Sequence, residues 1–401
     1  MIPIALDELG SEQPLRLAPR AGRALNSSGV VEARPDLADA GLWWVQAAGM
    51  VGVARIADVE IWVRPKVPIE RLFFLLGYAK NPLGWRDETL DVEVRDDLVP
   101  ALAQALGRQS ERALQQGLLQ GYRVCEEAAP VLRGRLRETD QLRRRFGMPL
   151  PIEVRYDEFT VDISENQLLR AAAERMLRVP RVDVAARRRL RHVLSRLADA
   201  SGLVRGQPLP TWQPSRLNAR YHSALRLAEL VLRGTSVDHT PGTVAVNGFL
   251  LAMPRLFEDF VTVALTEELR QYGGRADKPM VFLDDDRLVR MIPDLVWWRN
   301  GTPTAVIDAK YKAEKPAGFP DADLYQVLAY CTALNLPRGH LVYARGNEQP
   351  ARYVVRHCGI EIVCHALDLD RPPPVLLEQV RHVAREIADV RVGLVLPPLR
   401  R

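Results

Sequence analysis

The sequence predicts an α+β protein with several domains: a small N-terminal β-domain, a helical middle region and a C-terminal α/β domain. Three patterns support this prediction. Short alternating strands with glycine breaks fill residues 41–66, amphipathic helical spacing runs from about 98 to 235, and helices and strands alternate after about 240. With 401 residues, the chain is long enough to form two or three hydrophobic cores.

The predicted N-terminal β-domain covers residues 1–95, although residues 1–40 carry no clear pattern. Apolar and polar residues alternate over 59–64, as expected for a half-buried strand. Pro68 then opens a helix, because apolar side chains recur at helical spacing from Ile69 to Leu76.

The middle region, residues 96–238, is predicted to be helical. Ser164 followed by Gln167 matches a capping box at the start of a helix. The arginine-rich run at 187–191 suits either phosphate contact or a solvated helix face, and the second interpretation is favoured in so arginine-rich a chain. The proline-rich segment 206–215 predicts a linker within this region.

The segment RMIPDLVWWRNGTPTAVIDAKYK (290–312) lies in the third predicted domain, residues 239–401, and carries the clearest chemical signal. Asp294 follows a proline. Asp308 and Lys310 point to the same side of an apolar strand, because side chains alternate with period two. Two carboxylates beside a lysine suit a hard divalent cation that faces a phosphodiester.

The register of this hairpin decides whether the two aspartates meet. A plain two-residue turn at the Asn-Gly dipeptide 300–301 would set Asp294 against Ile307 and send the two carboxylates to opposite faces. A three-residue loop or a β-bulge would instead set Asp294 against Asp308. Pro303 has no N–H for the ladder, which favours an irregular strand. The metal hypothesis therefore requires an odd-length loop or a bulge.

Lysine is rare in this chain: of its 55 Lys and Arg residues, nearly all are Arg. The six lysines are Lys66, Lys80, Lys278, Lys310, Lys312 and Lys315. Because lysine is a compact point charge and arginine a planar fork, keeping lysine at 310 favours a chemical role over scattered surface charge.

Composition narrows the function classes. The chain is 47% hydrophobic and 26% charged, and no apolar run approaches the roughly 18 residues of a membrane span. Its start, MIPIALDELGSEQ, has acids where a signal peptide needs basic and then apolar residues, so a cytoplasmic location is expected. A net charge of +5 mildly favours an anionic partner but does not by itself indicate DNA binding.

Four cysteines are too few and too scattered for a disulfide framework. Cys358 and Cys364 lie beside His357 and His365, which suggests zinc as one interpretation. The spacing does not match a zinc finger, and the intervening GIEIVC predicts a strand. Buried or half-buried free cysteines are therefore favoured.

The acids and the lysine resemble the motif of the PD-(D/E)xK nuclease superfamily, with Asp294 in IPD as the first acid and Asp308 and Lys310 in DAK as the second half. The resemblance implies a PD-(D/E)xK nuclease domain with a further carboxylate on the preceding helix, matched by Glu258 in LFEDF. A polar residue on the following helix is matched by Gln326 in DLYQVLAY. It implies that Glu258, Asp294 and Asp308 bind Mg²⁺, with Mn²⁺ as a possible substitute.

Other acids near this motif are expected to be structural. Consecutive acids at 284–286 predict a solvated turn before the hairpin, and Asp323 and Tyr325 are assigned no chemical role. Glu258 taken alone is an ordinary exposed helix acid, since Glu is rarely buried.

The resemblance extends to the McrC family, the nuclease subunits of McrBC modification-dependent restriction systems, over residues 45 to 345. Upstream of the acids, three segments of this chain resemble the family: GVARIADVEIWVRPKVPIERLFFLLGYA, GLLQGYRVCEEAAPVLRGRLRETDQLRR and VDISENQLLRAAAERML. It implies a Mg²⁺-dependent endodeoxyribonuclease that cleaves modified double-stranded DNA together with a separate McrB-like AAA+ GTPase. This chain has no G-x-x-x-x-G-K-[ST] phosphate loop of its own.

The resemblance also implies how the partner is engaged. The N-terminal β portion would enter the pore of the GTPase ring and stimulate hydrolysis, and Arg55, Arg64 and Lys66 are candidate contacts. Because a duplex has two strands, self-association or pairing of complexes is expected. Two alternatives remain open: a non-catalytic adaptor of an AAA+ ring, and a stand-alone PD-(D/E)xK nuclease that acts on branched or damaged DNA.

Overall fold

The computed structural model of the chain describes residues 2–79, 82, 98–204, 206–233, 246–311, 321–344 and 351–389. The chain forms two units: the first comprises residues 1–90, 237–246 and 250–401, and the second comprises 91–236 and 247–249. The predicted domain boundaries near 95 and 238 lie outside the described residues. No helix in the described ranges is both long enough and apolar enough to cross a bilayer.

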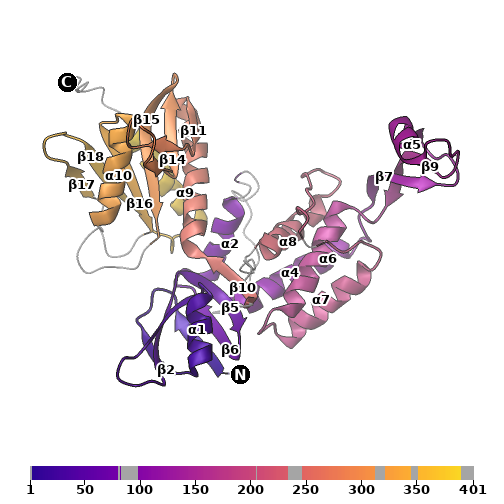
Figure 1. Cartoon of the computed structure of the whole chain (residues 1–401), viewed down its shortest axis with the longest axis horizontal. Helices are drawn as coiled ribbons and strands as arrows, with labels where there is room; N and C mark the ends of the chain where they lie inside the picture. The colour runs from indigo at the N-terminus through magenta and orange to yellow at the C-terminus, as the bar shows by residue number, and fades with distance from the viewer. Residues whose placement is uncertain are drawn as a thin grey trace. The chain divides into compact units, whose positions relative to one another are not determined.

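The N-terminal part of the first unit contains two sheets (Figure 1). The four-stranded sheet has the order β1 (Ile2–Asp7), β6 (Val59–Arg64), β5 (Met50–Ile56) and β10 (Val246–Ala252). The three-stranded sheet has the order β2 (Gln13–Arg16), β4 (Leu42–Ala47) and β3 (Val31–Pro35), and α1 (Pro19–Ser27) packs on β3. Residues 1–40 thus form regular elements that their sequence pattern did not predict.

The alternating strand over 59–64 is confirmed, since β6 buries every second side chain. The helix after Pro68 is also confirmed as α2 (Ile69–Tyr78). Pro68 suits the position just before the first helical residue, because it has no N–H that would be left without a partner there.

The C-terminal part of the first unit is built on a mixed six-stranded sheet. Its order is β11 (Arg275–Asp277), β14 (Leu295–Arg299), β15 (Thr302–Lys310), β16 (Arg338–Ala344), β18 (Glu361–Leu367) and β17 (Ala351–Val354). Strands β15, β16 and β18 run parallel, and the other neighbours are antiparallel. A two-stranded ribbon, β12 (Val281–Phe282) and β13 (Arg290–Met291), precedes the hairpin.

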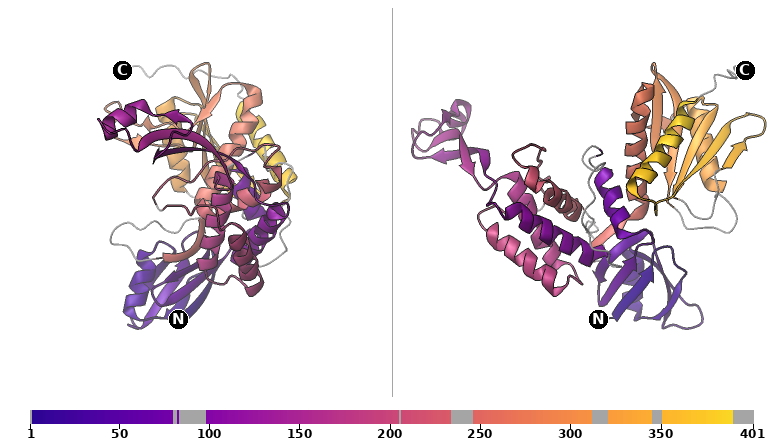
Figure 2. Two further views of the ribbon diagram at one scale, coloured as in Figure 1. Left: turned by 90° about the vertical axis from the view of Figure 1, so that its right-hand side faces the viewer. Right: turned by 180° about the vertical axis from the view of Figure 1, so that it is seen from behind.

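Three long helices flank this sheet: α9 (Met253–Leu269), α10 (Asp321–Leu334) and α11 (Pro373–Ala388). Helices α9 and α11 pack against each other on one face, and α10 covers the other face (Figures 1 and 2). The close approach of α10 requires Gly339 in β16, because a Cβ there would lie 2.4 Å from Val327 and 2.6 Å from the sulfur of Cys331. The predicted α/β arrangement of this region is confirmed.

The second unit contains a group of packed helices, α4 (Leu98–Leu114), α6 (Ser164–Arg178), α7 (Val184–Arg196) and α8 (His222–Arg233), with the short 3₁₀ turn η1 (Ala219–Tyr221). These helices confirm part of the predicted helical region. Segment 206–215 has no regular structure, as expected of a linker.

The prediction of a helical middle region is wrong for residues 121–160. This segment, the β7–β9 arm, forms a three-stranded antiparallel sheet of β7 (Gly121–Ala129), β9 (Ile152–Thr160) and β8 (Arg135–Leu136), with α5 (Glu138–Arg145) between β8 and β9 (Figure 1). The strands were missed because their exposed face carries apolar side chains, among them Tyr122, Val124 and Phe159, so burial does not follow the apolar–polar pattern of the sequence. Large hydrophobic side chains exposed on the arm are Tyr122, Val124, Val131, Leu132, Leu136, Leu142, Phe146, Met148, Leu150 and Phe159.

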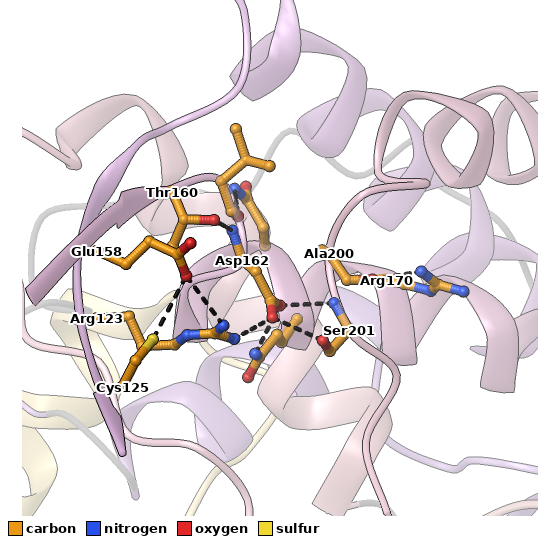
Figure 3. Close-up of polar contacts among 11 residues, drawn as sticks. Arg123, Cys125, Glu158, Thr160, Asp162, Arg170, Ala200 and Ser201 are labelled. Carbon is orange, nitrogen blue, oxygen red and sulfur yellow. Dashed lines mark hydrogen bonds and ion pairs between the residues drawn. The ribbon is translucent and has the colours of Figure 1, made fainter. Parts of the chain in front are cut away.

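Asp162 fixes the base of this arm (Figure 3). Its carboxylate accepts hydrogen bonds from Ser201 N–H and Oγ, both at 2.6 Å, and from Gln167 Nε2 at 2.8 Å, and it forms an ion pair with Arg123. Burial raises the pKa of Asp162, but these hydrogen bonds and the Arg123 charge outweigh it and hold the pKa below its ordinary value. The predicted capping box is therefore wrong: Ser164 is the first residue of α6 and caps nothing, and Gln167 bonds to Asp162 instead.

The arginine-rich run in α7 is partly structural, which neither interpretation anticipated. Arg187 donates hydrogen bonds to the carbonyl oxygens of Leu177, Val179 and Val182, where α6 ends and its carbonyls need donors. Arg189 forms an ion pair with Glu111 at 2.7 Å. The remaining arginines, Arg188 and Arg191, are exposed, as a solvated face predicts.

Candidate functional site

Strands β14 and β15 carry the two acids predicted to hold a cation. Arg299 pairs with Thr302 across a two-residue turn, and the φ angles of Asn300 and Gly301 are 51° and 77°. Both values lie in the left-handed region that this turn requires and that asparagine and glycine tolerate best. The turn is thus the plain two-residue form, which on its own would separate the two aspartates.

A β-bulge restores the register that the metal hypothesis requires. The pairing shifts by one residue between Trp297 and Trp298, so Thr304 is an extra residue in β15. Beyond the bulge, the ladder continued by one residue sets Asp294 opposite Asp308. The predicted bulged hairpin is confirmed.

Asp294 is buried at the start of β14, with 9% of its surface exposed. Its Oδ2 accepts a hydrogen bond from Ala309 N–H at 2.9 Å, and its Oδ1 accepts one from Lys278 Nζ at 3.2 Å. Burial, followed by the negative charge of Asp308, raises the pKa of Asp294 to about 6. Two ionised carboxylates this close are unfavourable unless a cation lies beside them.

Asp308 is more deeply buried, with 2% exposed. Its Oδ2 lies 2.5 Å from Lys310 Nζ, yet within the described residues this oxygen accepts no hydrogen bond of normal geometry. Burial raises the pKa of Asp308 above its ordinary value, and Lys310 offsets this only in part. A buried oxygen with an unused lone pair is a costly feature that a bound cation would relieve.

Glu258 reaches this group from α9. Its carboxylate forms an ion pair with Lys278, which also contacts Asp294. Lys278 follows β11, whose pairing of Asp277 with Val296 in β14 brings the next residues of the chain beside Asp294. The sequence patterns did not identify Lys278 as a site residue; the only signal was that it is one of six lysines.

Gln326 does not contact the carboxylates. Its Nε2 lies 2.7 Å from the hydroxyl of Tyr330, whose own pKa is raised to about 12 by burial and then by the charge of Asp308. Gln326 is therefore connected to the site through Tyr330. Asp323 accepts a hydrogen bond from Tyr343 Oη at 3.0 Å, and Tyr325 is exposed.

The donor set fits a hard divalent cation. Three carboxylates, on α9, just before β14 and on β15, could supply oxygen ligands, and among the described residues Asp308 Oδ2 has only the Lys310 ammonium beside it. Within the same ranges, no three His, Cys, Asp or Glu side chains are grouped closely enough to hold a metal ion. The ammonium of Lys278 forms ion pairs with both Glu258 and Asp294.

Tyr311, the residue after Lys310, links the site to the N-terminal sheets within the first unit. Its ring lies 6.0 Å from that of Phe257, the neighbour of Glu258 on α9. Its hydroxyl is paired with the carboxyl of Glu8, and burial followed by Glu8 raises the pKa of Tyr311. The helix that carries Glu258 and the end of the strand that carries Asp308 are therefore in contact through Phe257 and Tyr311.

The candidate partner contacts lie on the four-stranded sheet and after it, and all three are exposed. Arg55 pairs with Glu60 at 3.1 Å. Arg64 pairs with Asp7 at 3.2 Å and stacks over the ring of Trp62, and the backbone N–H of Lys66 donates to Glu8. Nothing in these contacts selects one of the three.

The zinc interpretation of residues 357–365 is not supported within the described chain. Cys358 and Cys364 are free, and Cys364 is buried, as the favoured interpretation expects. His365 Nε2 lies 3.0 Å from His340 Nδ1 rather than beside a cysteine sulfur. Burial lowers the pKa of His365 to about 3, so the pair is neutral.

The sequence was compared with models of protein families. Residues 45–344 match the family described as "McrBC 5-methylcytosine restriction system component". The chain belongs to this family. The match covers well over half of the sequence, includes Glu258, Lys278, Asp294, Asp308, Lys310 and Gln326, and confirms the family resemblance that the motifs indicated.

A solved structure shares the fold of this chain. A chain of the refined half-complex from the tetradecameric assembly of Thermococcus gammatolerans McrB AAA+ hexamers with bound McrC has 18% identity and a TM-score of 0.58, covering 96% of this chain and 100% of that chain. The cryo-EM structure of the Thermococcus gammatolerans McrBC complex has 19% identity and a TM-score of 0.38, covering 67% of this chain and 88% of that chain. No curated protein matches the sequence.

Proposed function

We propose that this McrBC-system component is the Mg²⁺-dependent DNA endonuclease subunit, with its catalytic site in a PD-(D/E)xK domain. The single observation that carries the proposal is the bulge in β15. It aligns two buried aspartates whose pKa values are both raised, and it does so beside a lysine on the same strand. Two buried acids with raised pKa values at one end of a hairpin are typical of a functional site.

In this proposal Glu258, Asp294 and Asp308 hold the divalent cation. When bound, Mg²⁺, or Mn²⁺ in its place, acts as a Lewis acid that makes water a better nucleophile and offsets charge on the phosphate. Ala309 N–H keeps the Asp294 carboxylate in place. The ammonium of Lys310 faces the scissile phosphate and stabilises the additional negative charge of the transition state. Hydrolysis adds the elements of water across one P–O bond.

The partner in this proposal is a McrB-like AAA+ GTPase ring whose hydrolysis the chain stimulates. The similar solved assembly contains McrB AAA+ hexamers with bound McrC, which supports a partner of this class. Arg55, Arg64 and Lys66 are one candidate contact surface. The β7–β9 arm is a second candidate, because it exposes many large hydrophobic side chains that a protein partner would cover. Changing Phe146 and Leu142 to Ser, or Arg55 and Arg64 to Glu, identifies which surface the GTPase binds.

Double-strand cleavage in this proposal needs two such sites, supplied by self-association or by paired complexes. The test is cleavage of methylated and unmethylated plasmid by the chain with a McrB-like GTPase, with and without GTP, in Mg²⁺ or Mn²⁺ and in Ca²⁺ as a silent control. We expect cleavage only of the methylated plasmid, with GTP and Mg²⁺ or Mn²⁺.

The same assay separates the two alternatives. Cleavage without GTPase or GTP would favour a stand-alone nuclease. If the GTPase is stimulated but no metal supports cleavage, the chain is a non-catalytic adaptor and the nuclease proposal is wrong. Asp308→Asn and Lys310→Ala should each lose cleavage while GTPase stimulation survives. Asp285→Asn, an exposed acid in the turn before the same hairpin, is the matched control.

A further inference from the structure

Lys278 occupies an unusual position for a lysine. Its ammonium forms ion pairs with both Glu258 and Asp294, the two carboxylates that reach the site from α9 and β14. The neighbouring Asp277 is fixed, because it pairs with Val296 and accepts a hydrogen bond from Trp298 Nε1 at 2.7 Å. The end of β11 therefore delivers the Lys278 side chain to the acids in a defined way.

The contacts of Asp294 show why this matters for a metal. One oxygen accepts from Ala309 N–H and the other from Lys278 Nζ, so both already have a partner. A cation held jointly by Glu258 and Asp294 needs the lone pairs that now face the ammonium. Lysine and metal thus compete for the same oxygens.

Lys278 is also able to leave. Its side chain is 45% exposed and ends a flexible four-carbon stem, so it can swing into solvent without opening the core. Lys310, which pairs with Asp308, is by contrast only 18% exposed. The two lysines of the site therefore differ. Lys310 is largely buried beside Asp308, whereas Lys278 is half-exposed and pairs with two acids.

We propose that Lys278 is a resident counter-ion that holds Glu258 and Asp294 together in the metal-free protein and is displaced by the divalent cation. The inference rests on the proposed metal-dependent function and adds a positioning residue to it. Lys278 lowers the metal affinity of the free protein. Once displaced, its ammonium is available to a DNA phosphate, so DNA and metal assist each other's binding.

The experiment measures Mn²⁺ affinity by calorimetry and by Mn²⁺ electron paramagnetic resonance in the full-length wild type, Lys278→Met and Lys278→Gln. The matched control is Arg275→Met, which removes one positive charge three residues before Lys278; Arg275 pairs with Asp277 and not with the site acids. We expect both Lys278 variants to bind Mn²⁺ about tenfold more tightly than the wild type, the effect of removing one partly exposed competing charge, whereas Arg275→Met changes affinity less than about twofold.

A second readout follows the metal-free proteins. Without Mn²⁺ the Lys278 variants should unfold at a lower temperature than the wild type, because Glu258 and Asp294 lose their shared counter-ion, and Mn²⁺ should raise their Tm by a larger amount. A short DNA duplex should increase the Mn²⁺ affinity of the wild type more than that of Lys278→Met, because only the wild type has the Lys278 ammonium to contact a DNA phosphate.

The outcomes separate the two proposals. Unchanged or weaker Mn²⁺ binding in both Lys278 variants, with normal binding in the wild type, overturns the counter-ion role and leaves the metal site standing. If the wild type and every variant fail to bind Mn²⁺, the metal site itself is wrong and the inference falls with it.

Discussion

Asp162 in the second unit and Asp294 in the hairpin are both buried carboxylates, but their surroundings act on them in opposite directions. Asp162 receives hydrogen bonds from Ser201 and Gln167 and the charge of Arg123, and its pKa is held below the ordinary value (Figure 3). Asp294 is buried near the negative charge of Asp308, and its pKa is raised. The protein neutralises the first acid fully and leaves the second one crowded.

The difference separates a structural acid from a functional one. A carboxylate whose oxygens are satisfied by fixed donors stabilises the fold and has no capacity left for a ligand. A pair of acids with raised pKa values costs stability and gains it back when a cation arrives. Substitutions at the two places should therefore separate activity from stability.

The largest effect is expected for Asp308→Asn. Cleavage should fall by at least about a thousandfold, because the most buried oxygen ligand loses its charge. Thermal stability in the absence of metal should stay the same or rise, since like-charge repulsion with Asp294 is removed. Plasmid nicking and a Tm measurement on the same preparation test both parts. Full cleavage by Asp308→Asn would show that the buried acids of the hairpin are not functional.

Deletion of Thr304 tests the bulge itself. Without this residue the plain register continues from the turn, and Asp294 turns away from Asp308. Cleavage and Mn²⁺ binding should both fall at least about a hundredfold, as expected for misplaced catalytic groups, while GTPase stimulation persists. Thr304→Ala keeps the bulge and serves as the control. Equal loss in both variants would show that the side chain, rather than the register, matters.

Asp162→Ala should instead destabilise the second unit by about 3 kcal/mol, because Arg123 and Ser201 lose a buried partner. Hydrogen exchange should show lost protection at the base of the β7–β9 arm and at the start of α6. Mn²⁺ affinity of the first unit should not change. A loss of metal binding without loss of protection would contradict the structural role.

The smallest effect is a difference in pH dependence. The pKa of Asp162 is lowered in the fold, so its stabilisation is present above its unfolded pKa, near 4, and is lost as pH falls through the folded value. The pKa of Asp294 is raised, so its contribution is favourable at low pH and is lost as pH rises toward about 6.

Metal-free Tm values between pH 3 and 7 test these two signs. Asp294→Asn should gain a few degrees over the wild type above pH 6, the size expected from a modest change in unfolding free energy, and little at pH 4. Asp162→Asn should lose stability at neutral pH and approach the wild type in acid. Identical curves for the two variants would show that their environments do not differ.

Sequence reasoning found the hairpin because its signals are local. Period-two alternation and the Asn-Gly turn are read within a few residues, and Pro303 indicated the irregular strand that became a bulge. Lys278 was missed because its contact with Asp294 depends on β11 pairing with β14, a neighbour relation that no local pattern encodes.

Two other errors have equally physical causes. In the β7–β9 arm the apolar Tyr122, Val124 and Phe159 lie on the exposed side of the strands, so burial does not follow the apolar–polar pattern of the sequence. Ser164 matched a capping box by spacing, but the N-cap of α6 is Ile163, and Gln167 donates its side-chain N–H to Asp162. In each case the neighbours in space, rather than in sequence, determined the result.

The central claim is that Asp294 and Asp308 share one divalent cation, and Mn²⁺ binding measures it most directly. Calorimetry on the wild type, Asp294→Asn, Asp308→Asn and the control Asp285→Asn should give one Mn²⁺ site in the wild type and the control. Binding should be lost in both hairpin variants. Wild-type affinity in either Asp294→Asn or Asp308→Asn would contradict a shared site.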